Sequence, residues 1–133
     1  NIIIKDQLPR ADYQELVCNA DVGLISLNEK FTIPNIPSKT LSYFNARVPI
    51  LAAIDPHTDY GKILESSGSG LWSVTGDIKK YKSNFDQLYN NPELRRQMGE
   101  SGYRYLVEHL TPTHAYKLIM EGINNKAFMP AES

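Results

Sequence analysis

The chain has a single cysteine, no excess of charge of either sign and no long apolar run, and each shortage excludes a class of protein. One cysteine cannot form a disulfide within the chain, and Cys18 lies in an apolar helical pattern, so we expect a small buried side chain and a reducing compartment. A net charge of −1 offers no overall field to attract nucleic acid. Because no run reaches about 18 apolar residues, no segment is predicted to span a membrane, and we expect a cytoplasmic location.

Glycine-rich phosphate-binding loops and clustered metal ligands are also missing. Neither a Walker loop nor Gly-x-Gly-x-x-Gly occurs, which argues against P-loop NTPases and dinucleotide-binding proteins. The three histidines, His57, His109 and His114, are scattered, so no metal site is predicted. Ser26 follows no nucleophile elbow, which leaves no support for a Ser-His-Asp hydrolase.

What is present is an ordinary globular composition. The chain has 133 residues, of which 41% are hydrophobic, enough for one domain with a sizeable core. It opens directly on Ile2-Ile3-Ile4, without an initiator Met or a leading turn, and we therefore expect a piece of a longer protein, incomplete at its N-terminus.

Apolar runs alternate with helical patterns over the first two thirds of the chain. The runs predict strands, and an apolar spacing of three to four predicts helices. The predicted strands are 2–5, 22–27, 49–54 and 71–74. A first helix of about ten residues is predicted from the apolar spacing between Tyr13 and Ala20, and the other predicted helices are 38–46, 58–66, 77–91, 92–110 and 114–124. This alternation is typical of parallel βαβ units, so we predict an α/β fold with a doubly wound parallel sheet and C-terminal helices. Residues 1–110 are expected to form a Rossmann-like domain, and residues 111–133 a final helix with a loose tail.

Ligands of open parallel sheets bind beyond the carboxyl ends of the strands, and the longest loop there is the strongest candidate. It runs from Asn28 to Thr40 and ends in Pro37-Ser38-Lys39-Thr40. Proline presets the first helical turn, so free amides, two hydroxyls and the Lys39 ammonium converge at the helix start, as a phosphate or diphosphate requires. An ordinary helix cap with a solvated lysine is the competing interpretation of this spacing.

A second polar cluster, Asp55, His57 and Asp59, follows the third predicted strand. Acid-base chemistry is conceivable there, but such turns usually cap the next helix, and we interpret the cluster as structural.

Three segments together resemble a known family. They are "NIIIKDQLPRADYQELVCNADVGLISL", "IPSKTLSYFNARVPILA" and "SSGSGLWSVTGD". The pattern is similar to the C-terminal, nucleotide-sugar-binding half of GT-B glycosyltransferases of the family 4 type, which build bacterial capsular and lipopolysaccharide glycans. The likeness covers residues 1 to 123.

The resemblance implies a retaining transfer of a sugar from a UDP- or GDP-linked donor, with no further cofactor. Ser38, Lys39 and Thr40 would meet the donor diphosphate, and Lys39 would be the catalytic cation. Ser42 stands where the family has a ribose-binding glutamate, with Tyr43 beside it.

The family also implies what the rest of the molecule does. The loop at Asp6 and Gln7 would lie near the base of the nucleotide, and the helix from Thr113 to Ile123 would cross back to an N-terminal domain. That missing domain would bind the saccharide or lipid-linked acceptor, so this chain should be inactive alone. In the full-length protein the resemblance also allows peripheral association with the inner membrane.

The alternative from another class is a non-catalytic α/β binding module or a receiver-like module. In that interpretation Asp6, Asp21 and Asp55 would form an acidic pocket.

Overall fold

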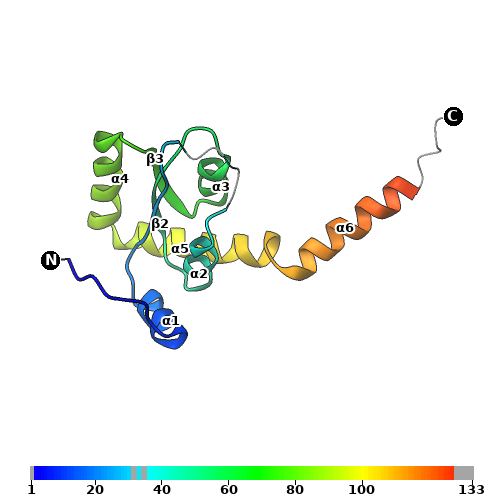
Figure 1. Ribbon diagram of the computed structural model, residues 1–133, viewed down its shortest axis with the longest axis horizontal. Coiled ribbons are helices and arrows are strands. Elements are labelled where there is room, and N and C mark those ends of the chain that lie inside the picture. The colour runs from blue at the N-terminus through cyan, green and yellow to red at the C-terminus, as the bar shows by residue number, and fades with distance from the viewer. Residues whose placement is uncertain (1, 31–32, 34–35, 128–133) are drawn as a thin grey trace.

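The computed structural model describes residues 2–30, 33 and 36–127, which form a three-stranded sheet and six helices (Figure 1). The elements follow in the order α1 Arg10–Cys18, β1 Gly23–Ser26, α2 Lys39–Asn45, β2 Ile50–Ile54, α3 Tyr60–Ser67, β3 Gly70–Val74, α4 Ile78–Asn90, α5 Pro92–His109 and α6 Pro112–Ala127. The described part of the chain is therefore an α/β structure, compatible with the Rossmann-like class.

The sheet is parallel throughout, in the order β1-β2-β3. Leu24 of β1 lies opposite Leu51 of β2, which in turn lies opposite Leu71 of β3. Two crossovers, through α2 and α3, join the strands and wind in one direction along the sheet. The doubly wound sheet predicted from the sequence would also continue beyond β1 in the opposite direction, and no described strand does so.

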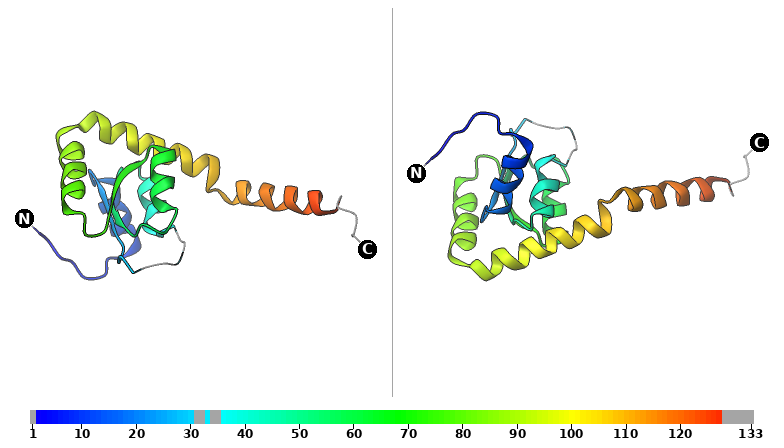
Figure 2. Two further views of the ribbon diagram at one scale, coloured as in Figure 1. Left: turned by 90° about the horizontal axis from the view of Figure 1, so that it is seen from above. Right: turned by 90° about the horizontal axis from the view of Figure 1, so that it is seen from below.

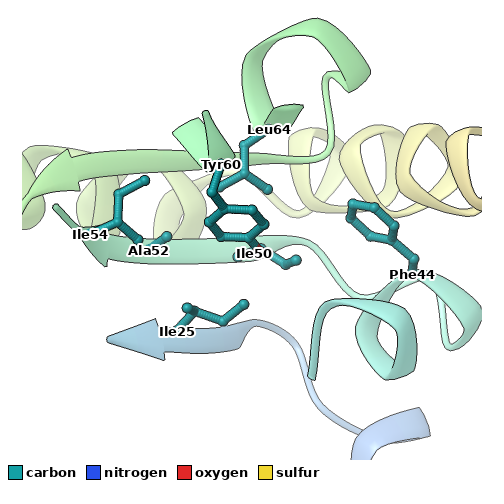
Figure 3. Close-up of a cluster of buried hydrophobic side chains, with 7 residues drawn as sticks. All are labelled: Ile25, Phe44, Ile50, Ala52, Ile54, Tyr60 and Leu64. Atoms are coloured by element: carbon teal, nitrogen blue, oxygen red, sulfur yellow. The ribbon is translucent and has the colours of Figure 1, made fainter. Parts of the chain in front are cut away.

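One face of the sheet carries the main core. Ile50, Ala52 and Ile54 alternate along β2 and meet Phe44 from α2 and Tyr60 from α3 (Figure 3). All five side chains are buried, as expected for a central parallel strand covered by crossover helices.

On the opposite face, α4 covers β2 and β3. Leu51, which points away from the main core, lines a groove together with Leu88 and Phe85 of α4. The Asn84 side chain donates to the backbone oxygen of Trp72 at 2.9 Å, which ties α4 to β3. Helices thus lie on both faces of β2.

Helix α5 passes the amino ends of the strands and contacts the main core there. A Cβ at Gly99 would collide with the backbone oxygen of Arg47, and one at Gly102 would collide with the Phe44 ring. Because these two positions lack side chains, α5 can approach the turn before β2 closely. The Tyr105 ring then packs edge-on against Phe44, with centroids 6.2 Å apart.

Helix α6 leaves the body of the molecule after Leu110, and both views of Figure 2 show it extending away from the sheet. The predicted separation between the helices at 92–110 and 114–124 is confirmed, because α5 ends at His109 and α6 begins at Pro112. The apolar stripe of Tyr116, Ile119 and Ile123 is exposed along α6.

Two predictions of the sequence are wrong. Residues 2–5 form no strand, and Ile2, Ile3 and Ile4 are almost fully exposed. A β-branched run becomes a strand only where a neighbouring strand accepts its hydrogen bonds, and none of the described strands does so for this run. Cys18 is exposed rather than buried, because Val17 is the residue of α1 that faces inward.

The other three predicted strands are confirmed to within about one residue at each end, as β1, β2 and β3. The end of the predicted loose tail, residues 128–133, lies outside the described residues.

Candidate functional site

The carboxyl edge of the sheet is held together by hydrogen bonds between the loops that leave it. Thr75, directly after β3, donates its hydroxyl to the Leu27 oxygen at 2.8 Å and its amide to the Ile54 oxygen at 2.8 Å. The Leu27 amide in turn donates to the Ala53 oxygen at 2.9 Å. The three strand ends therefore form one rigid platform at the edge where ligands of such sheets bind.

Asp55, the first residue after β2, is fully buried and holds a turn. Its carboxylate accepts from the His57 amide at 2.8 Å, from the Thr58 amide at 2.9 Å and from the Thr58 hydroxyl at 3.1 Å. Burial alone would raise the pKa of Asp55, but these bonds to the charged form outweigh it, so the pKa lies below its ordinary value.

His57 and Asp59 do not join Asp55 in a catalytic group. His57 is exposed, and the Asp59 carboxylate pairs with Lys62 at 2.8 Å on the surface of α3. Both oxygens of Asp55 are occupied by its own turn. The structural interpretation of this cluster fits the geometry.

Ser38 and Lys39 lie exposed where the loop from β1 enters α2. Ser38 occupies the N-cap position, and its side chain makes no capping bond to the helix. The hydroxyl and the Lys39 ammonium are therefore accessible from solvent at the carboxyl edge of the sheet.

Thr40 is not available to a ligand, which corrects the sequence-based expectation. Its side chain is fully buried, and its hydroxyl is 2.7 Å from the Tyr60 hydroxyl. Its amide donates to the Pro37 oxygen at 2.9 Å. Thr40 joins α2 to α3, so only Ser38 and Lys39 of the three predicted residues face solvent.

Tyr60 explains why Thr40 turns inward. Its ring lies in the core between α3 and the sheet (Figure 3), and its hydroxyl needs a partner there. Burial raises the pKa of Tyr60, which keeps the hydroxyl protonated, although the Thr40 bond works in the opposite direction.

Ser42 and Tyr43 lie on different faces of α2. Ser42 is half-buried, one turn after Ser38, and lines a groove of about 430 Å³ between α1 and α2. The Tyr43 ring instead packs on Gly23, where a Cβ would collide with it, and its hydroxyl donates to the Leu24 oxygen at 3.3 Å. Burial raises the pKa of Tyr43. Tyr43 thus supports β1, while Ser42 stays on the accessible side.

Asp6 and Gln7 are exposed in the extended segment before α1. Within the described ranges, no hydrogen bond joins either residue to α2. Among the described residues, Asp6 and Gln7 therefore form no hydrogen-bonded group with Ser38 and Lys39.

The acidic pocket of the alternative interpretation does not form. Asp21 precedes β1 and lies near Arg95, at 3.4 Å, whereas Asp55 follows β2 at the opposite edge of the sheet. In the part of the chain that the structure describes, no three acidic, histidine or cysteine side chains are placed to hold a metal ion.

A row of small side chains crosses the sheet and was not predicted from the sequence. Ser26, Ala53 and Ser73 are register partners near the strand ends. The sequence feature that could have predicted this row is a serine near the end of an otherwise apolar strand, which occurs in both "GLIS" and "GLWSV".

No protein-family model, no curated protein and no solved structure matches this chain significantly. Over residues 2–30, 33 and 36–127, none of the helices combines the length and the apolar character that crossing a bilayer requires.

Proposed function

We propose that this chain is the donor-binding part of a retaining glycosyltransferase that uses a nucleoside-diphosphate sugar, with a GT-B architecture. The observation that carries the proposal is the joint exposure of Ser38 and Lys39 at the carboxyl edge of a parallel sheet. An exposed hydroxyl and an exposed ammonium at consecutive positions suit the oxygens of a diphosphate. The sequence resemblance assigns the same two residues to the same ligand.

In this proposal, Lys39 acts on the leaving group. As the bond between the sugar and the distal phosphate breaks, negative charge grows on the diphosphate, and the ammonium stabilises it. Loss of one such group typically costs about 3 kcal/mol of barrier, or roughly a hundredfold in rate. Ser38 positions the phosphates, and Ser42, one turn further on, is a partly accessible hydroxyl for the ribose.

Two features outside the site support the larger architecture. The stripe of Tyr116, Ile119 and Ile123 on α6 is uncovered, as expected of a helix that packs on a second domain carrying the acceptor. Strand β1 pairs with β2 alone among the described strands, so the sheet can continue past β1 in the second direction of a doubly wound fold.

Thermal unfolding with UDP, GDP and Mg²⁺, each added separately, tests the proposal. A nucleotide at ten times its dissociation constant stabilises the folded state by about 1.4 kcal/mol, which raises the midpoint by several degrees. We expect Lys39→Ala to abolish this shift. Lys117→Ala, an exposed lysine on α6, is the matched control and should leave it unchanged.

The outcomes separate the two functional classes. Stabilisation by either nucleotide that depends on Lys39 supports the transferase. A response to Mg²⁺ alone supports the non-catalytic binding module, and a nucleotide shift that survives Lys39→Ala means that the diphosphate site lies elsewhere.

A further inference from the structure

The outer side of β3 is a free edge of the sheet. Among the described strands β3 pairs with β2 alone, so no neighbouring strand covers its other side. A groove of about 290 Å³ is lined by all five residues of the strand, Gly70–Val74, and therefore follows this edge. Such an edge pairs with any extended chain that reaches it unless something blocks its backbone groups.

The register shows which backbone groups of β3 face outward. Directly before and after the strand, the Ser69 oxygen and the Thr75 amide bond to backbone groups of β2, at 3.1 and 2.8 Å. In a parallel pair, alternate residues turn their backbone groups toward the same neighbour. The odd-numbered residues of this stretch therefore bond to β2, and the backbone groups of Gly70, Trp72 and Val74 point outward.

Two of these three outward oxygens already have donors. The Asn84 side chain of α4 donates to the Trp72 oxygen at 2.9 Å, at the centre of the edge. The Asp77 amide donates to the Val74 oxygen at 3.0 Å, where the chain turns into α4. Because Asn84 is only 1% exposed, its side chain is held in place. An incoming strand would have to displace the Asn84 amide before its own N–H could pair with the centre of β3.

The chain itself carries a segment suited to such an edge. Ile2, Ile3 and Ile4 are between 82% and 92% exposed, and none of the described strands pairs with them. Runs of β-branched residues favour sheets, and an unpaired run gains most from an edge that lacks a neighbour. In a second copy of the chain, this isoleucine run is therefore the segment that fits the β3 edge.

We propose that the hydrogen bond from Asn84 to Trp72 blocks strand addition at β3, and that the strand it excludes is the run Ile2–Ile4 of a second copy. The proposal explains why α4 buries an asparagine on the side that meets the sheet. A buried amide is costly unless it is hydrogen-bonded, and an apolar residue there would leave the Trp72 oxygen free. The contact uses neither Ser38 nor Lys39, so the inference does not rest on the proposed donor function.

Sedimentation equilibrium of the full chain tests the inference, at concentrations up to about 1 mM, where weak association becomes measurable. Wild type should sediment as a single chain. Asn84→Ala frees the Trp72 oxygen, and we expect its self-association to be at least about fivefold tighter, as the gain of one backbone hydrogen bond implies. Asn90→Ala is the matched control and should behave as wild type, because the Asn90 side chain donates to the Asp86 oxygen within α4 itself, at 2.8 Å.

A second substitution separates strand addition from loss of the fold. Ile3→Lys in the Asn84→Ala background places a charge in the middle of the isoleucine run, and charged side chains oppose edge pairing. Because Ile3 is exposed, the fold should tolerate the change, and the double variant should return to a single chain. In Asn84→Ala alone, the amide NMR spectrum should remain that of the native chain, with concentration-dependent shifts at Gly70, Trp72 and Val74.

Four results would overturn the inference. Wild type could associate as strongly as Asn84→Ala, or that variant could stay a single chain at every concentration. Its association could persist unchanged after Ile3→Lys, which would exclude the isoleucine run as the added strand. Association could also appear only together with loss of the native NMR spectrum, and the contact would then come from unfolded chains rather than from the β3 edge.

Discussion

The buried hydroxyl pair between Thr40 and Tyr60 gives a quantitative test of how α2 and α3 are joined. The two oxygens are 2.7 Å apart, and both side chains are at least 99% buried. Replacing either residue with an apolar shape leaves the other hydroxyl unpaired in the core. We therefore expect Thr40→Val and Tyr60→Phe each to lower the free energy of unfolding by about 1–3 kcal/mol.

The double variant Thr40→Val/Tyr60→Phe should be much less destabilised than the sum of the single variants. Both hydroxyls are then gone, and an apolar pair of similar shape is nearly neutral. The coupling free energy from this double-mutant cycle should be about 1 kcal/mol or more. Urea unfolding followed by the fluorescence of Trp72, the only tryptophan, measures it. Additive single effects would refute the direct bond and return Thr40 to the candidate ligands.

The pH dependence of the same pair has a definite sign. Burial raises the pKa of Tyr60 above its unfolded value of 10.0. The folded state therefore keeps a proton that the unfolded chain loses, so the contribution of Tyr60 to stability is complete below pH 10.0 and declines as the pH rises above it. Tyr60→Phe should make the alkaline decline smaller and leave the part due to Tyr43, whose pKa is also raised, whereas Tyr89→Phe, an exposed control, should retain the full decline.

Three further predictions concern the rest of the fold. Gly99→Ala should lower the free energy of unfolding, measured in urea, by about 1–3 kcal/mol, because the new methyl group collides with the Arg47 oxygen. Gly122→Ala, its control in open space on α6, should raise that free energy by about 0.5–1 kcal/mol. Leu64→Ala, in the core, should cost about 2–5 kcal/mol by the same measurement. The pKa of Asp55 is lowered in the folded state, so its carboxylate stabilises the fold at a pH above the ordinary pKa of 3.8. This stabilisation is lost as the pH falls below that value. In acid unfolding curves, the difference in unfolding free energy between wild type and Asp55→Asn should therefore shrink.

The strands inside the sheet were predictable because sequence and surroundings agree. The runs at 22–27, 49–54 and 71–74 are apolar and end at polar or glycine-containing turns, and each has a parallel neighbour. Ile2-Ile3-Ile4 has the same composition but no partner among the described strands. The β-propensity of isoleucine favours an extended chain there. Whether a strand forms depends on pairing with a neighbouring strand, and the sequence of one segment does not encode that pairing.

The position of the loop that enters α2 was predictable, but the orientation of α2 was not. The loop that ends at Ser38 and Lys39 does meet the sheet at its carboxyl edge. Hydrophobicity alone would place Leu41 and Phe44 of α2 inward, yet Leu41 is 45% exposed and Thr40 is buried. Thr40 and Phe44 are four residues apart and share one helix face, so the spacing held the information that Thr40 turns inward.

The uncovered apolar surface of this chain is unevenly distributed, and the distribution bears on how the sheet is completed. On the β1 side, Leu24 is 56% exposed, while Leu51, its partner in β2, is fully buried. A parallel strand is normally covered on both faces, and β1 has Ile25 buried on one face only. Structure added beyond β1 would cover Leu24 and leave Ser38 and Lys39 accessible at the carboxyl edge. The proposed donor site would then lie at the point where the two directions of winding meet, which is where open α/β sheets bind their ligands.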